Sequence, residues 1–204
     1  MNSSLWLRQF VGVLLVVGSG LFLVGAANPL LVRVWISPDE IALPIIRDHP
    51  LAWRTTALLM SAATVLTAVG LWLLADLKAT DGSPLARAGA LLYALAAALW
   101  LCFQAFRLTV TPAAAAVIDG PVDPAYSLMG RWASGLFATF TILAGAALIL
   151  FGTAWLTAGT STIAGLAGVV LGAVIVVGFV VSGDMPPFVA FLPTGLFGLV
   201  LLMG

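Results

Sequence analysis

Charged residues are absent from five long stretches of this chain. The stretches 9–32, 55–75, 88–106, 132–183 and 185–204 contain no Asp, Glu, Lys or Arg. A helix needs about 20 mostly apolar residues to cross the hydrocarbon core of a bilayer. Four of the stretches have about this length, and the fifth is long enough for two helices. Because an open sheet cannot satisfy its backbone groups in lipid, the pattern predicts an all-α fold, a polytopic transmembrane bundle of six helices.

The turn signals between these stretches set the expected helix boundaries. Ser83 and Asp123 each precede a proline, an arrangement typical of an N-cap followed by the first helical residue. Pro112 predicts the end of a helix or a kink in it, and the polar segment 157–162 predicts a turn inside the long uncharged stretch. We expect one transmembrane domain over residues 1–204, with helices at about 6–27, 51–75, 85–111, 126–157, 162–181 and 187–203.

The connection at residues 28–50 contains four prolines and the acidic residues Asp39, Glu40 and Asp48. Ser37 followed by Pro38 and, three residues after the serine, Glu40 is a capping-box pattern. Pro44 would clash with the carbonyl group of Glu40, so we expect any helix here to be about one turn long. The connection is predicted to lie on the membrane surface.

The composition favours a multi-pass protein of a bacterial inner membrane, with the lipid bilayer as its main partner. Apolar residues make up 62% of the chain and charged residues 8%, and the formal net charge is zero. Soluble domains have roughly 45–50% and 25%. Without a basic run, nucleic acid binding is not expected. Tryptophans near the predicted helix ends indicate headgroup anchors: Trp6, Trp53, Trp72, Trp132 and Trp155.

Two features of the first helix bear on topology. Its charged start, apolar run and small residues at 25–27 are similar to a signal peptide, but the apolar run continues to Val32, so we expect it to be retained. With the N-terminus inside, three Lys and Arg residues face the cytoplasm and five face away, which favours the opposite orientation. The long acidic, proline-rich connection translocates more readily, and on that ground we expect a cytoplasmic N-terminus.

Several chemistries are excluded because the residues they need are too few. His49 is the only histidine, Lys78 the only lysine and Cys102 the only cysteine. Two-histidine haem ligation, a retinal Schiff base within the membrane and a zinc site within the bilayer are therefore not expected. All acidic residues lie at helix ends or in connections, which argues against a proton relay. We predict no catalytic residue, cofactor or metal site.

Gln104 and Arg107 are the polar residues closest to the membrane interior, on one face of the third predicted helix. In one interpretation Arg107 is buried and binds an anionic group. In the other its side chain reaches the interface by snorkelling. Energies favour snorkelling, because one Arg costs about +2.5 to +3.5 kcal/mol even at the bilayer centre. The apolar residues of the same helix offset this at roughly −0.3 to −0.6 kcal/mol each.

Two further candidates lie in the last two predicted helices. Ala164, Gly168 and Gly172 recur every four residues and predict a close helix-packing face, used either within the bundle or for a homo-oligomer or a membrane partner. Pro193 predicts a helix break, a feature that in transporters marks binding sites when it recurs in both halves.

The layout resembles a family of uncharacterised six-helix bacterial membrane proteins, grouped as a domain of unknown function. The features that carry this resemblance are the Arg8-to-Gly12 opening and the Ala-rich segment 94–100 that continues to Phe106, Arg107 and Leu108. The resemblance implies no known activity and no functional residues.

Three functions stay open at this point. The first is a non-catalytic accessory subunit or a small bundle that binds a ligand or lipid. The second is a transporter of an apolar or anionic small molecule that uses Arg107 and the Pro193 break. The third is an enzyme at the membrane face that uses Asp48 and His49, although no second histidine or activated nucleophile accompanies them.

Overall fold

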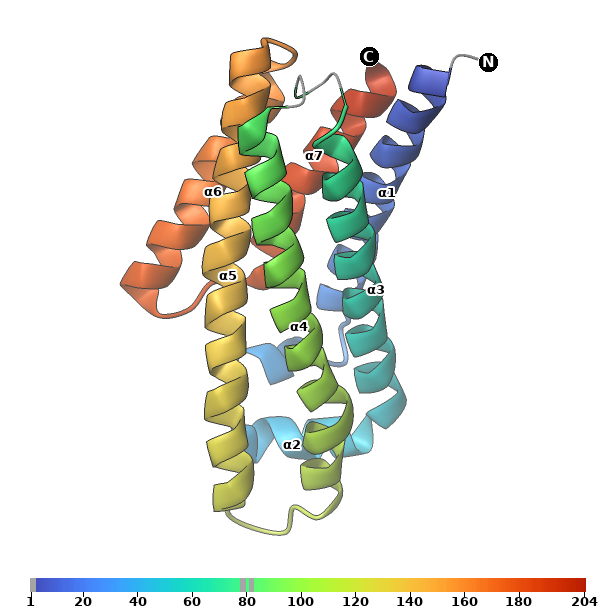
Figure 1. The fold of residues 1–204 in the computed structure, drawn as a ribbon. Coiled ribbons are helices and arrows are strands. Elements are labelled where there is room, and N and C mark those ends of the chain that lie inside the picture. Colours follow the sequence, from blue (N-terminus) through green and yellow to red (C-terminus); the bar gives the residue numbers. More distant parts are fainter. Residues whose placement is uncertain (1–2, 78–79, 81–82) are drawn as a thin grey trace.

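The computed structural model describes residues 3–77, 80 and 83–204, and these residues form helices joined by turns and loops (Figure 1). Lys78 and the start of the predicted turn at 81–84 lie outside the described residues. The long helices are α1 (Ser3–Ala26), α3 (Pro50–Leu74), α4 (Pro84–Ala116), α5 (Pro124–Ala158) and α6 (Thr162–Ser182). The short elements are η1 (Val32–Trp35), α2 (Asp39–Asp48), η3 (Pro187–Ala190) and α7 (Phe191–Met203), of which η1 and η3 are 3-10 turns.

Five of these helices, α1 and α3 to α6, are long and apolar enough to cross a membrane. The prediction of an all-helical bundle is confirmed, whereas the expected count of six membrane-length helices is not. The last predicted helix, 187–203, is divided into the four residues of η3 and the 13 residues of α7. The division lies at the N-terminal side of Pro193, which has no backbone N–H to donate.

Side-chain caps start three of the long helices. The Ser83 hydroxyl accepts from the amide of Leu85 at 3.2 Å, and the Asp123 carboxylate accepts from the amide of Ala125 at 2.7 Å. The predicted N-caps at these two residues are therefore confirmed. Ser161 caps α6 in the same way, after Gly159 has ended α5 with a φ of 65°, in the left-handed region that favours glycine.

Two proline predictions are wrong in a similar way. Pro112 lies inside α4, which continues to Ala116, so of its two predicted effects the helix end at 111 is wrong. Pro44 lies inside the ten-residue α2 instead of limiting it to one turn. In both places the continuing turns have buried residues, such as Ala115 in α4 and Ile46 in α2. Burial of an apolar face compensates for the hydrogen bond that each proline removes.

The predicted capping box at the start of α2 is also wrong. Pro38 is the N-cap residue, with a φ of −65° and a ψ of 161°, and no side chain accepts a cap hydrogen bond there. Asp39 and Glu40 instead occupy the first turn, where their negative charges interact favourably with the helix dipole.

The long helices and α7 close into a ring of packed neighbours. Following contacts around the ring, α1 packs on α3, then α3 on α4, α4 on α5, α5 on α6, α6 on α7, and α7 on α1. In Figure 1, α4 and α5 extend below the level at which α6 turns back toward η3 and α7, and α2 crosses this lower end. The connection between α1 and α3 therefore covers one end of the bundle.

The buried apolar residues form two clusters. The larger cluster, here called the bundle core, fills the ring and includes Phe22, Met60 and Trp100. The smaller one, here called the end cluster, joins α2 to the lower ends of the long helices. Its buried members are Leu31, Leu43, Ile46, Trp53, Phe106, Ala115, Tyr126 and Ala133.

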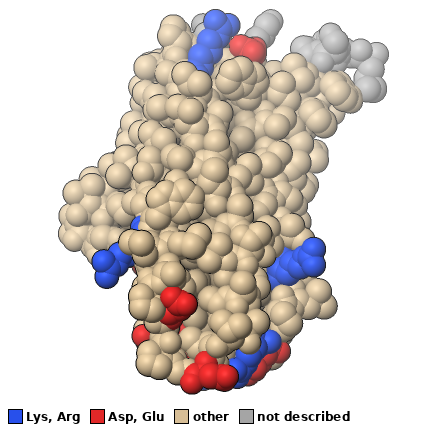
Figure 2. Space-filling model, turned by 60° about the horizontal axis from the view of Figure 1, so that its bottom comes forward, with Lys and Arg blue, Asp and Glu red and all other residues tan. Residues whose placement is uncertain are grey.

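The surface is arranged as expected for a protein in lipid. Figure 2 shows charged side chains toward the two ends and an uncharged band between them. Trp6, Trp72 and Trp132 are more than half exposed, as a headgroup anchor requires, whereas burial of Trp53 and Trp155 contradicts that role for these two. The two buried rings lie in the end cluster and the bundle core, so proximity to a helix end does not decide burial.

Candidate functional site

Arg107 lies on the inner face of α4, where the bundle core meets the end cluster. It contacts Met60 of the first and Trp53 of the second. The residue is only 5% exposed. The energetically favoured prediction of a side chain that extends freely into the interface is therefore wrong, because protein encloses the guanidinium. Aromatic residues from two distant parts of the chain cover it, and the sequence around α4 contains no sign of them.

The guanidinium group lies over the faces of two tryptophan rings. Its Cζ atom is 4.3 Å from the ring centroid of Trp53 and 4.6 Å from that of Trp35, and the ring of Phe103 follows at 5.8 Å. A cation over an indole face is stabilised by the ring quadrupole, by about 2 kcal/mol or more where water is excluded. Trp35 comes from η1, Trp53 from α3 and Phe103 from α4, so three elements build the aromatic walls.

Gln104 and Met60 hold one nitrogen of the guanidinium. Nη1 of Arg107 lies 3.5 Å from Sδ of Met60. When the amide of Gln104 is oriented so that its oxygen accepts from the Trp100 indole, that oxygen is 3.3 Å from both Trp100 Nε1 and Arg107 Nη1. This orientation satisfies both donors and is the one we adopt. The predicted pair Gln104 and Arg107 is thus brought together on one face of α4.

Backbone contacts fix the aromatic walls. The indole Nε1 of Trp53 donates to the carbonyl oxygen of Arg107 at 2.7 Å, which ties α3 to α4 at the site. The ring of Trp35 stacks on that of Trp53 at 5.8 Å between centroids. At the start of the connection, Asn28 Nδ2 donates to Thr56 Oγ1 at 3.0 Å. The segment that carries Trp35 is therefore anchored to α3 at a point before η1.

Arg107 has no carboxylate partner within the described ranges. The ion pairs there are Arg47 with Asp48 and Arg87 with Asp76, each at 3.4 Å and each largely exposed. Nη2 of Arg107 is buried and has no hydrogen-bond partner. An unpaired charge in such a place is unfavourable, because removing one member of a buried ion pair costs about 3–5 kcal/mol. The site therefore has an unsatisfied positive charge and a free donor.

The acidic residues of α2 do not supply this charge. Partial burial, followed by the neighbouring charge of Glu40, raises the pKa of the Asp39 carboxyl group. Asp48 pairs with its neighbour Arg47 at the surface, and His49 forms the junction between α2 and α3. In the part of the chain that the structure describes, no three His, Cys, Asp or Glu residues gather as a metal site.

The small residues of α6 face another helix of the same chain. Ala164 is fully buried, and a Cβ atom added at Gly168 would lie 2.8 Å from Cα of Gly152 on α5. A Cβ atom at Gly172 would lie 2.7 Å from the carbonyl oxygen of Gly145, also on α5. These glycines let the backbones of α5 and α6 approach closely. The face predicted for packing thus packs inside the chain.

Pro193 is buried near the start of α7, beside a polar pair in the bundle interior. Thr194 Oγ1 donates to the carbonyl oxygen of Phe191 at 2.9 Å, so Ser19 Oγ is the donor in the 3.0 Å bond between the two hydroxyls. This pair joins α1 to α7. It lies apart from Arg107 in the sequence and shares no hydrogen bond with it.

Sequence reasoning placed Gln104 and Arg107 together but missed the residues that enclose them. Trp35, Met60 and Phe103 had no assigned role, and Trp53 was expected at the lipid headgroups. A tryptophan on each side of the 36–52 segment could have drawn attention to these two rings. Comparisons of the chain with protein-family models, curated proteins and solved structures give no match. The function must therefore be argued from the geometry of the site.

Proposed function

We propose that this protein is a non-catalytic membrane bundle that binds an anion at Arg107. The observation that carries the proposal is the buried guanidinium, which has aromatic walls, a free Nη2 and no carboxylate partner in the described part of the chain. A bound oxyanion would supply the missing charge and accept from Nη2. Charge-assisted hydrogen bonds of this kind are about twice as strong as neutral ones.

We further propose that the bundle crosses a bacterial inner membrane six times. The apolar segment Pro187–Met203 supports a sixth crossing. Its 13 α-helical and four 3-10 residues rise about 28 Å, close to the roughly 30 Å hydrocarbon thickness. With a cytoplasmic N-terminus, the end that carries α2 would face away from the cytoplasm. In a Cys102→Ser background, Glu40→Cys should then react with a membrane-impermeant maleimide in intact cells. A cysteine that does not react would indicate the opposite orientation, with the N-terminus outside.

The anion-binding proposal is tested with the full chain in nanodiscs of zwitterionic phosphatidylcholine. The probes are inorganic phosphate, acetate, dimethyl phosphate and phosphatidylglycerol, and the readouts are tryptophan fluorescence and the unfolding midpoint. Arg107→Gln is compared with Arg131→Gln, because Arg131 is an exposed arginine on the adjacent helix α5.

We expect at least one probe to bind saturably to the wild type and to Arg131→Gln. Loss of the buried pairing should weaken this binding by about 100-fold or more in Arg107→Gln, since 3–5 kcal/mol corresponds to two to nearly four orders of magnitude. Binding that survives unchanged in Arg107→Gln, or binding of no probe at all, would overturn the proposal.

A transporter is the second candidate function. It is favoured by the Ser19–Thr194 hydroxyl pair, which lies in the bundle interior next to Pro193 and the change from η3 to α7. Polar groups beside an interrupted helix are a feature of transporter binding sites. Liposome uptake of the anion identified above should fall in both Arg107→Ala and Pro193→Ala. If neither substitution changes uptake, transport through Arg107 and the Pro193 break is wrong.

The packing face of α6 also bears on partners. We propose that any homo-oligomer or membrane partner contacts the outer side of α6, because Ala164, Gly168 and Gly172 are occupied by α5 in the same chain. The outer side has large exposed apolar residues, among them Val177 and Val180. Crosslinking through a cysteine at Val177 would detect such a contact, and its absence at all detergent concentrations would argue against it.

A further inference from the structure

We propose that the anion at Arg107 is the singly charged headgroup of an acyl amphiphile drawn from the surrounding leaflet. This inference rests on the proposed function and names the chemical class of its ligand. Three observations lead to it: the depth of Arg107 along the bundle, a row of aromatic rings that runs from the site to the lipid-facing surface, and a buried guanidinium whose Nη2 has no hydrogen-bond partner and whose charge has no carboxylate partner among the described residues.

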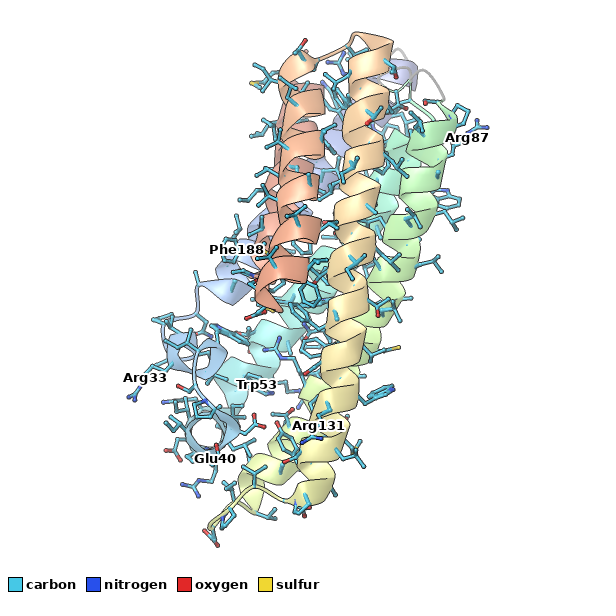
Figure 3. The ribbon with its side chains drawn as sticks, turned by 90° about the vertical axis from the view of Figure 1, so that its left-hand side faces the viewer. Arg33, Glu40, Trp53, Arg87, Arg131 and Phe188 are labelled. Carbon is cyan, nitrogen blue, oxygen red and sulfur yellow. The ribbon has the colours of Figure 1, made fainter. Side chains whose placement is uncertain are left out.

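The depth of Arg107 matches the level of lipid headgroups. Arg107 follows Arg87 on α4 by 20 residues, which is about 30 Å of α-helix and therefore about one hydrocarbon thickness. Arg87 is exposed at the other end, where it pairs with Asp76. Figure 3 shows Trp53, Arg33 and Arg131 toward the lower end of the bundle, below Phe188 on η3. A headgroup at this level can meet Arg107 while its acyl chain stays in the hydrocarbon.

A row of three phenylalanine rings runs outward from the guanidinium. Phe103 lies 5.8 Å from Cζ of Arg107, Phe137 on α5 lies 5.9 Å from Phe103, and Phe179 on α6 lies 6.3 Å from Phe137. All three residues are partly exposed. The row ends beside Val180, which is 70% exposed on the outer side of α6. An acyl chain that follows this row would leave the site directly into lipid.

The unpaired charge of the guanidinium limits the charge of the headgroup. Nη1 is held by Gln104 and Met60, which leaves Nη2 as the buried donor without a partner. The one guanidinium charge has no carboxylate partner within the described residues, so one singly charged oxyanion, a phosphodiester or a carboxylate, neutralises it, whereas a dianion would leave a second buried charge unpaired. The tryptophan walls add apolar contact area. A singly charged oxyanion on an acyl chain fits this combination better than a free inorganic ion.

The ring of Trp35 lies over the guanidinium, whose Nη2 is buried, so we expect this ring to move when the ligand enters. The four residues of η1 include no buried residue, and Trp35 itself is 38% exposed. Its stacking on Trp53 is therefore the main described contact that holds its ring over the site. We expect the headgroup to enter on the side that Trp35 covers.

The experiment compares phosphatidylglycerol with dimethyl phosphate, which has the same phosphodiester charge but no acyl chain. The full chain is placed in phosphatidylcholine nanodiscs with increasing mole fractions of phosphatidylglycerol whose acyl chains are brominated, because bromine quenches nearby tryptophans. The variants are Arg107→Gln, Phe137→Ala and, as a matched control on the opposite helix α1, Phe10→Ala. Phe10 is 40% exposed and stacks on Trp6.

Three results would support the inference. Quenching saturates at low mole fraction in the wild type and in Phe10→Ala. The half-saturating mole fraction rises by at least about tenfold in Arg107→Gln and in Phe137→Ala, a change of at least 1.4 kcal/mol in binding. Excess dimethyl phosphate does not displace the lipid.

Other results separate the two proposals. If dimethyl phosphate binds in an Arg107-dependent way and Phe137→Ala has no effect, the amphiphile is wrong but anion binding stands. If brominated phosphatidylcholine quenches with the same saturation as phosphatidylglycerol, the charge selectivity is wrong. If phosphatidylglycerol does not bind but another of the four anions does in an Arg107-dependent way, only the amphiphile is wrong. If none of the four anions binds, both proposals fail.

Discussion

Replacing Arg107 with methionine should separate a ligand site from a structural anchor. Methionine keeps an unbranched, flexible side chain among the same neighbours but removes the charge. In the ligand-free wild type, two cation–π contacts contribute about 2 kcal/mol each. The unpaired buried charge opposes them by about 3–5 kcal/mol. These two effects nearly cancel. We therefore expect the free energy of unfolding of Arg107→Met to lie within about 2 kcal/mol of the wild-type value when no anion is present.

The assay is thermal unfolding in phosphatidylcholine nanodiscs, with and without the anion that binds the wild type. For a chain of this size, 1 kcal/mol corresponds to roughly 2–4 °C in Tm. The ligand-free midpoints of wild type and Arg107→Met should therefore differ by less than about 8 °C, and only the wild type should gain stability from the anion. The reasoning is refuted if the ligand-free variant loses far more than this, or if it still gains stability from the anion.

Three further outcomes follow from the structure. Trp35→Ala should speed up association of the anion, because the guanidinium then loses one of the two indole rings that lie over it. Stopped-flow tryptophan fluorescence measures the association rate, and an unchanged rate would contradict entry past Trp35. Gly168→Leu should disrupt the packing of α6 on α5, because a Cβ atom there has no space. Gly135→Leu should not, because no atom lies within 4 Å of a Cβ atom added at Gly135. If gel filtration in detergent shows the two variants to be equally monodisperse, the packing argument is wrong. Asp123→Ala should lower the free energy of unfolding by about 0.5–2 kcal/mol, because the α5 cap is lost, whereas Asp123→Asn should retain most of the stability that the cap provides. Equal unfolding midpoints for the two variants would show that the cap contributes nothing.

Helix positions could be read from the sequence wherever the cause was local. The uncharged stretches, the caps at Ser83 and Asp123 and the turn at 157–162 depend on nearby residues, and all appear in the structure. The proline rules at positions 44 and 112 failed because packing of the surrounding turns compensated for a missing hydrogen bond. The last segment was placed correctly but not recognised as a 3-10 turn followed by a short helix.

The candidate site shows the same limit more clearly. The spacing of Gln104 and Arg107 on one helix face was visible, and both the buried and the snorkelling positions were considered. The choice between them depended on Trp35 and Trp53, which are 72 and 54 residues away in the sequence. No periodicity links residues at such separations, so hydropathy alone does not show that protein encloses the guanidinium.

The sequence alone determined a set of apolar helices, because its uncharged stretches have the length that a membrane-crossing helix needs and a helix satisfies all its backbone groups within one segment. Only the tertiary structure decided that Arg107 is enclosed, since the connection between the first two long helices folds back and brings indole rings over the guanidinium. Backbone satisfaction in lipid is a local requirement that each segment meets by itself. Desolvation of a charge depends on what the rest of the chain packs against it.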